Sequence, residues 1–175
     1  MALPSREKLI AQLTQQEYAL LKSLTDVGPL DAKSLEASVN AVVRDRLAFA
    51  RSFIEAARVL AASGDPLIRR GSVSRAYYGA YHAARATVFA IRHHDEDHHG
   101  RVAQTIDSVL DGKVAVGGLL KELRLRRDEL EYSPYPGPND EAQYDAAETE
   151  DLIQRTLQQA EEVVRSLETH LRERR

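Results

Sequence analysis

The sequence predicts an all-α fold, an antiparallel up-and-down helical bundle of five to six helices. Residues that favour helices, above all alanine, leucine, arginine, glutamate and glutamine, are abundant along the whole chain. Apolar residues recur at intervals of three and four positions over long stretches, and no segment alternates for long with period two. Glycine and proline interrupt these stretches where a bundle needs turns.

Two helices are expected in the first part of the chain. The first occupies about residues 5–25, and Gly28 and Pro29 end it because both oppose helix continuation. The second follows Asp31, whose carboxylate can cap it, and continues to about residue 62. Its apolar stripe comprises Val43, Leu47, Ala50, Ile54, Ala57 and Ala61.

Further helices are expected after a turn at residues 63–66. They are a helix from about residue 67 or 72 to 92, a short helix that ends near residue 110, a helix at about 116–132 and a last helix at about 142–171. The last helix carries a stripe of Ile153, Leu157, Ala160, Val164, Leu167 and Leu171. Such stripes suit either packing in a core or a dimer seam, and we favour packing in the core.

Composition limits the classes of function. The 175 residues suit one domain with a real core, and the net charge of −3 gives no overall attraction to nucleic acid or to an anionic membrane. A site for a polyanion must therefore be a local patch. The absence of cysteine excludes disulfides and thiolate metal sites. No signal-peptide layout and no apolar run of about 18 residues occurs, so we expect a cytoplasmic protein without a membrane span.

Three segments carry a resemblance to a known family. They are SRAYYGAYHAARA at residues 74–86, HGRV at 99–102 and LRLRRDELEY at 123–132. In composition and order they resemble the second, third and fourth core helices of the HEPN superfamily. The resemblance covers about residues 43–171. It implies that residues 1–40 form an N-terminal helical extension and that residues 41–175 form a HEPN-like bundle.

The resemblance implies a chemistry as well as a fold. Many HEPN proteins are metal-independent ribonucleases, and several are toxins partnered by a nucleotidyltransferase-like antitoxin. Their signature is an arginine followed after four to six residues by a histidine, presented twice across a homodimer. Arginine can stabilise charge on the phosphoryl oxygens, and histidine can move protons near neutral pH.

This chain departs from that signature. Arg127 is followed after four residues by Tyr132, which stands where the family has histidine. A tyrosine with an ordinary pKa of about 10 is a poor base at neutral pH. Losing a positioned proton-transfer group typically lowers the rate by about a hundredfold to ten-thousandfold. The departure argues against ribonuclease activity and leaves phosphate binding by Arg127 intact.

Basic residues near Arg127 form the first group of candidate binding residues. They are Lys121, Arg124 and Arg126, and with Arg127 they could form a strip that binds phosphate. Residues 128–154 contain no lysine or arginine and many carboxylates. The alternative is therefore a solvated basic face that is paired to this acidic stretch.

A second group lies on the helix that contains residues 74–86. Arg75, Tyr78 and His82 recur at intervals of three and four, hence on one face, and could line a cleft that faces Arg127. The alternative is a hydrogen-bond network that supports the bundle. The resemblance adds His99 to this site. Arg127, Tyr132 and His82 are the catalytic candidates, and the other residues of the two groups are candidates for binding a nucleic acid or nucleotide.

Two further features of the sequence suggest a ligand or a modification. The run HHDEDHH at residues 93–99 contains metal-ligand residue types, but contiguous loop residues rarely converge on one ion. We favour a solvated loop and expect no metal and no cofactor. In the toxin branch a tyrosine near the motif can be adenylylated by the partner enzyme, which makes Tyr132 and Tyr135 candidates for modification.

Three hypotheses of function remain open. In the first, the chain is a homodimer that binds RNA or a nucleotide and acts beside a nucleotidyltransferase-like partner in a toxin–antitoxin or defence system. In the second, it is an active metal-independent ribonuclease in which His82 or His99 replaces the missing histidine. In the third, it is a non-catalytic helical interaction module.

Overall fold

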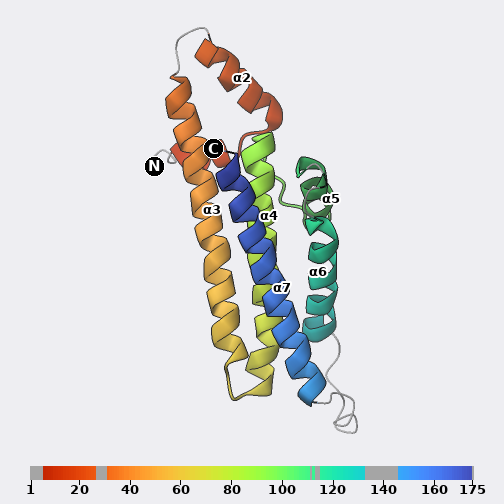
Figure 1. Cartoon of the computed structure of the whole chain (residues 1–175). Helices are drawn as coiled ribbons and strands as arrows, with labels where there is room; N and C mark the ends of the chain where they lie inside the picture. Colours follow the sequence, from red (N-terminus) through yellow and green to blue (C-terminus); the bar gives the residue numbers. More distant parts are fainter. Residues whose placement is uncertain (1–5, 27–30, 111, 113–114, 133–145, 175) are drawn as a thin grey trace.

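The computed structural model describes residues 6–26, 31–110, 112, 115–132 and 146–174. These residues form seven α-helices and no strand, which confirms the all-α fold class, with a helix number slightly above the five to six expected (Figure 1). The helices are α1 (Arg6–Ala11), α2 (Gln15–Asp26), α3 (Ala32–Ala61), α4 (Pro66–Arg92), α5 (His99–Val109), α6 (Val116–Tyr132) and α7 (Ala146–Glu173). Helices α3, α4, α6 and α7 alternate in direction, so the bundle is antiparallel and up-and-down.

The prediction of a single helix at about residues 5–25 is wrong, because the structure has two helices there, α1 and α2. Thr14 begins the second helix through a reciprocal pair of hydrogen bonds with Glu17. The backbone N–H of Thr14 donates to Oε2 of Glu17 over 2.8 Å, and the N–H of Glu17 donates to Oγ1 of Thr14 over 3.3 Å. This capping box satisfies N–H groups that a helix start leaves unpaired, and so it favours a new helix at this point.

Aspartate caps fix the starts of both long helices of the first hairpin. Asp31 accepts from the backbone N–H groups of Lys33 and Ser34, as expected from the sequence. Asp65 accepts from the N–H of Leu67, and Pro66 occupies the first turn, where its missing N–H costs nothing. The third expected helix therefore begins at Pro66, one residue before the earlier of the two starting points considered.

Helix α4 lies at the centre of the bundle and is in contact with α3, α5, α6 and α7. Small residues allow this close packing. At Gly79 an added Cβ would lie 2.6 Å from Cδ1 of Ile54 and 3.2 Å from the carbonyl oxygen of Ala50, so only glycine lets α3 approach this far. The expected stripes of α3 and α7 pack within the chain, mostly buried, which confirms packing in the core rather than a dimer seam.

Helix α5 is held against the start of α6 by another glycine. The backbone N–H of Gly117 donates to Oδ1 of Asp107 over 2.7 Å. A Cβ at Gly117 would overlap the carbonyl oxygen of Ala103 and the carboxylate of Asp107. This contact sets the distance between α5 and α6, and therefore between the residues that the two helices present to α4.

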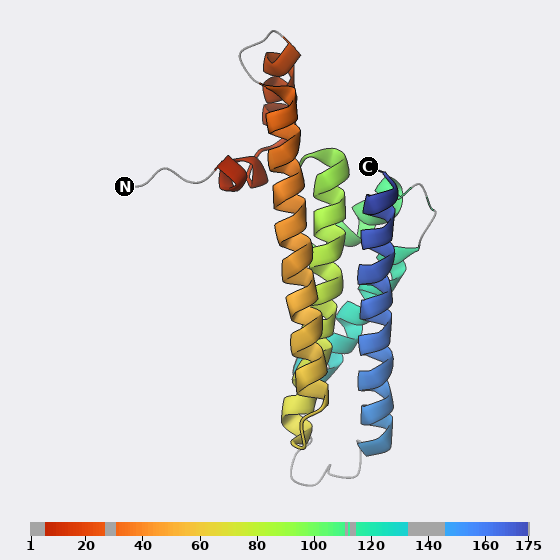
Figure 2. The ribbon, with the colours of Figure 1, turned by 60° about the vertical axis from the view of Figure 1, so that its left-hand side comes forward.

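The N-terminal helices lie at one end of the bundle. Figure 2 shows α3 extending beyond the other long helices at that end, where α2 lies beside it. The division expected at residue 40 falls inside α3, which continues through it without a break. Among the residues that the structure describes, no helix is long and apolar enough to cross a membrane.

Adjacent glycines of α6 provide a test of the α5–α6 contact. We expect Gly117→Ala to lower the free energy of unfolding by about 1–3 kcal/mol, because the added methyl group overpacks a site closed by backbone. Gly118 has open space around its Cβ position, so Gly118→Ala should be neutral or stabilising by up to about 1 kcal/mol. Urea unfolding of both variants measures the difference, and equal stabilities would contradict the tight contact.

Candidate functional site

Arg127 of α6 is packed against two tyrosines of α4. Its guanidinium carbon lies 4.9 Å from the ring centroid of Tyr77 and 5.7 Å from that of Tyr78. One guanidinium nitrogen, Nη1, donates to the hydroxyl of Tyr78 over 3.4 Å. Arg127 is only 8% exposed, so its charge acts from a largely desolvated position against the electron-rich faces of the rings.

His99, the first residue of α5, joins this group through Tyr77. Its Nδ1 and the hydroxyl of Tyr77 form a hydrogen bond of 2.6 Å. The ring of Tyr81 stacks on His99 with centroids 4.1 Å apart. Helices α4, α5 and α6 thus each contribute to one cluster, which we call the tyrosine–arginine site and define as Tyr77, Tyr78, His99 and Arg127.

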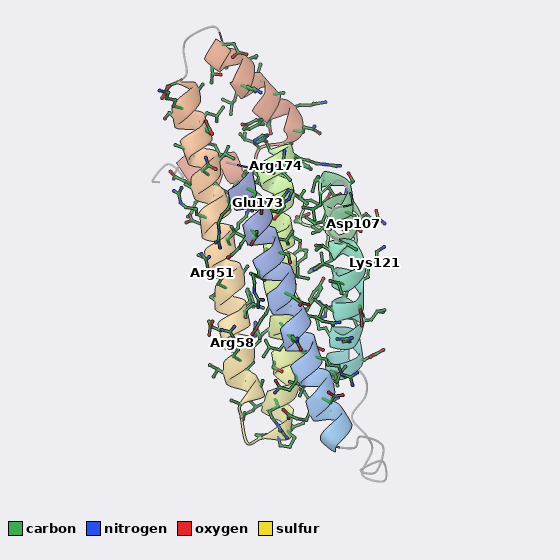
Figure 3. The ribbon with its side chains drawn as sticks, in the orientation of Figure 1. Arg51, Arg58, Asp107, Lys121, Glu173 and Arg174 are labelled. Atoms are coloured by element: carbon green, nitrogen blue, oxygen red, sulfur yellow. The ribbon has the colours of Figure 1, made fainter. Side chains whose placement is uncertain are left out.

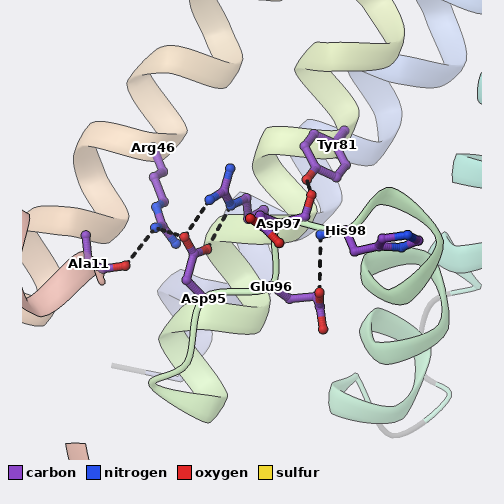
Figure 4. Close-up of polar contacts among 8 residues, drawn as sticks. Ala11, Arg46, Tyr81, Asp95, Glu96, Asp97 and His98 are labelled. Carbon is purple, nitrogen blue, oxygen red and sulfur yellow. Dashed lines mark hydrogen bonds and ion pairs between the residues drawn. The ribbon is translucent and has the colours of Figure 1, made fainter. Parts of the chain in front are cut away.

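Polar contacts fasten the loop that precedes α5 (Figure 4). Asp95 binds two arginines, with Arg46 of α3 at 2.9 Å and Arg85 of α4 at 2.5 Å. The hydroxyl of Tyr81 donates to the carbonyl oxygen of Asp97 over 2.6 Å. The two arginines hold the pKa of Asp95 below its usual value even though burial of its carboxylate acts to raise that pKa. Three side chains from two helices, α3 and α4, therefore anchor the loop.

The remaining members of the run at residues 93–99 separate rather than converge. His93 adopts a left-handed conformation with φ of 54° and stacks on Tyr18 of α2, with ring centroids 4.0 Å apart. Glu96 forms an ion pair of 3.3 Å with Arg101. In the described part of the chain, no group of three or more histidine or carboxylate side chains is arranged to hold a metal ion.

His82 lies beside the tyrosine–arginine site, among aromatic rings. Its ring stacks on Phe53 of α3 with centroids 5.3 Å apart, meets Phe49 edge-on at 4.8 Å and lies 6.3 Å from Tyr78. Burial lowers the pKa of His82 to about 4, and the charges of Arg85 and Arg46 act in the same direction. His82 is therefore neutral at neutral pH.

Arg75 is on the same face of α4 but turns toward α3. Its guanidinium carbon lies 5.6 Å from the ring centroid of Phe53. Of the three residues expected to face Arg127 from this helix, the structure brings Tyr78 into contact with it. Arg75 and His82, which precede and follow that tyrosine at one-turn intervals along α4, lie against the ring of Phe53 instead.

The basic residues of α6 divide between two faces. Arg124 lies on the side of the tyrosine–arginine site, since its charge and that of Arg127 both act on His99 and Tyr77. Figure 3 shows Lys121 on the outer side of α6. Arg126 turns the other way and donates to Thr156 over 3.3 Å and to Gln159 over 2.6 Å, both on α7. Arg126 is thus separated from the other three.

Asp128 pairs with two arginines of this strip, Arg124 and Arg127. Its Oδ1 accepts from Nε of Arg127 over 3.0 Å, and its Oδ2 lies 3.8 Å from Nε of Arg124. Burial acts to lower the pKa of Arg127, but the hydrogen bond and charge of Asp128 outweigh it and raise that pKa. The acidic stretch noted in the sequence therefore neutralises part of the strip through its first residue.

The protonation states of the site follow from its packing. Burial raises the pKa of Tyr77 to about 12 against the opposing charges of Arg127 and Arg124, so its hydroxyl keeps its proton at neutral pH. Burial and the same two arginines lower the pKa of His99. A neutral imidazole and an intact phenol thus stand beside a permanent cation.

Some candidates fall outside the described part of the structure. Tyr132 is the last residue of α6, and its side chain is not among those described, whereas Tyr135 lies outside the described residues altogether. Sequence reasoning did not select Tyr77, Asp128 or Phe53 for the site. Tyr77 belongs to the apolar stripe of its helix, and the contacts of Phe53 with α4 join positions far apart in the chain.

The comparison with protein families gives one match. The model of the HEPN domain matches residues 43–170, which is more than half of the chain and extends from within α3 to the last turn of α7. The comparisons with curated proteins and with solved structures gave no match.

Because the pKa of His82 is lowered, we expect the protein to lose stability in mild acid. The unfolded chain protonates this histidine as the pH falls through about 6.5, whereas the folded protein resists until its pKa of about 4. The unfolded protein then binds more protons than the folded protein. The contribution of His82 to the free energy of unfolding is therefore fully present above about pH 6.5 and declines below it. His82→Phe keeps an aromatic ring without the titration and should lose less stability than wild type between about pH 7 and about pH 5.

Urea unfolding at both pH values gives the comparison. His98→Gln, a change of an exposed histidine, should behave like the wild type and serves as the control. An unchanged pH dependence in His82→Phe would contradict the neutral, enclosed state of this ring.

Proposed function

The chain belongs to the HEPN domain family, and on this premise we propose that it binds RNA or a nucleotide at the tyrosine–arginine site. The observation that carries the proposal is the placement of Arg127. Its guanidinium is held by two tyrosine rings beside His99, and Arg124 lies on the same side of α6. A fixed guanidinium can donate two parallel hydrogen bonds to a phosphate, and a second cation adds to the attraction.

A phosphate that binds Arg127 would have to replace the carboxylate of Asp128. A phosphate that approached Arg127 would compete with the carboxylate that already accepts from its guanidinium. Asp128 is partly exposed, so its ion pair stabilises the folded protein by no more than about 1 kcal/mol and is readily replaced. A phosphate with its greater negative charge is a suitable replacement.

The biological setting is part of the same proposal. Family resemblance supports a homodimer that presents two copies of the site, a nucleotidyltransferase-like partner and a role in a toxin–antitoxin or defence system in the cytoplasm. The absence of a histidine four to six residues after Arg127 favours binding over cleavage. We therefore place binding first.

A metal-independent ribonuclease remains the second candidate, because one observation favours it. Nδ1 of His99 is engaged by Tyr77, whose ring also contacts Arg127. Nε2 of His99 makes no hydrogen bond to any residue that the structure describes, so it is the nitrogen that could exchange a proton with a substrate. His99 suits this role better than His82, which is enclosed by phenylalanine rings.

Neighbouring arginines of α6 give a matched test of binding. Arg127→Ala should weaken binding of a short single-stranded RNA by about tenfold to a hundredfold, because it removes a charged hydrogen-bond donor to phosphate. Arg126→Ala should change affinity by less than about twofold, since Arg126 is bound to α7. Fluorescence anisotropy at several salt concentrations measures both affinities and should give a shallower salt dependence for Arg127→Ala.

Asp128→Asn keeps the proposal testable if Arg127→Ala fails to fold. Removing the competing carboxylate should tighten RNA binding by about twofold to fivefold while Arg127 stays in place. Weaker or unchanged binding in Asp128→Asn, together with unchanged binding in a folded Arg127→Ala, would contradict RNA binding at this site. Absence of both RNA binding and cleavage in the wild type would leave the third hypothesis, an interaction module without ligand chemistry.

Cleavage is tested with a mixed RNA pool in the presence of a chelator. We expect the wild type to leave the pool intact, because no histidine follows Arg127 at the family's position. Products that disappear in both Arg127→Ala and His99→Gln would contradict this expectation and establish the second candidate. Products that persist in both variants would indicate a contaminating nuclease.

A further inference from the structure

An open groove with aromatic walls lies between α3 and α4. Its volume is about 460 Å³, and Phe49, Phe53, Val59 and Arg75 are among its lining residues. Phe49 is 51% exposed and Val59 is 72% exposed, so large apolar groups face solvent here. Phe49 and Phe53 meet edge-to-face with centroids 4.8 Å apart, which presents two differently oriented ring surfaces.

This groove is continuous with the tyrosine–arginine site. The ring of Phe53 lies 5.7 Å from that of Tyr78, and the hydroxyl of Tyr78 accepts the hydrogen bond from Arg127. A single tyrosine side chain therefore separates the aromatic groove from the proposed phosphate donor. The ring centroid of His82 lies 4.8 Å from that of Phe49 and 6.3 Å from that of Tyr78.

Arg75 gives the groove a positive charge. Its side chain is exposed, and it forms no ion pair with any residue that the structure describes. Its guanidinium lies over the ring of Phe53 instead. No carboxylate is among the residues that line the groove. A flat cation over an aromatic ring, open to solvent, is a suitable surface for a planar, electron-rich group.

We propose that this groove is a subsite for an unpaired nucleobase, next to the phosphate bound by Arg127. The inference rests on the proposed function and specifies its ligand as a single-stranded nucleic acid. Bases in a duplex are stacked and paired, whereas those of a single strand can leave the stack and lie on aromatic or guanidinium planes. Arg127 would bind the phosphate, and the phenylalanine rings on the other side of Tyr78 would bind the base of the same nucleotide.

Charge favours this occupant over a second copy of the chain. A two-fold contact places the same patch of both copies face to face. Contact through the groove would bring the Arg75 guanidinium of each copy into one apolar patch without a carboxylate to neutralise them. Like charges in such a contact are costly, whereas the phosphates of a nucleic acid neutralise the same arginine.

Matched RNA probes test the subsite. One is a short single-stranded oligoribonucleotide, and the other has the same length and charge but abasic residues throughout. Phe49→Ala should weaken binding of the base-bearing probe by about fivefold to a hundredfold, the range for loss of one stacked base, and change binding of the abasic probe by less than about twofold. Leu125→Ala removes a large side chain that is 62% exposed on α6 and should affect neither probe.

The variants distinguish failure of the subsite from failure of the phosphate site. If Arg127→Ala weakens binding of both probes but Phe49→Ala affects them equally or not at all, the nucleobase subsite is overturned and the phosphate site stands. Absence of any RNA binding by the wild type would overturn both. Light scattering tests whether a second copy of the chain occupies the groove. A wild-type dimer that becomes a monomer in Phe49→Ala, with equal losses of affinity for both probes, would assign the groove to a second copy and overturn the inference.

Discussion

Close packing around α4 is the constraint on which the rest of the structure depends. This helix is in contact with four others, and it can be so only because alanines and Gly79 leave room for their backbones. Tyr77 and Tyr81 are among the larger residues of α4, and both are almost fully buried. Their hydroxyls need partners within the protein, and they find them at His99 and at the loop before it. The position of α5 is therefore a consequence of where tyrosine interrupts the small residues of α4.

The same packing determines the electrostatics of the site. Arg127 is a permanent charge in a largely buried position, and the two tyrosine faces and Asp128 compensate for the water it has lost. Its field, with that of Arg124, favours the neutral form of His99. A site with one fixed cation and one uncharged imidazole is suited to attract an anion.

Much of the fold was predictable from the sequence because helix periodicity and aspartate caps are local signals. Asp31 and the spacing of the stripes fixed α3 and the extent of α7's apolar face. The break between α1 and α2 was also signalled locally, by Thr14 and Glu17, and was missed because the apolar spacing continues across it. The site was less predictable. Adjacent arginines such as Arg126 and Arg127 point about 100° apart on a helix, and which one faces α4 depends on the rotation of α6 in the bundle. Partners such as Phe53 and Tyr78 lie far apart in the chain, so no local pattern joins them.

The continuity of α3 has a mechanical consequence. With 30 residues it is a rod of about 45 Å, and its first turns belong to the N-terminal region while its last turns form part of the bundle. No hinge lies between the two, and Arg46 connects the middle of the rod to the carbonyl of Ala11 and to the loop that precedes His99. A torque applied at the first turns of α3 would therefore act on the bundle through one uninterrupted helix. A protein that bound the N-terminal end of α3 would thereby constrain the orientation of the tyrosine–arginine site without touching that site.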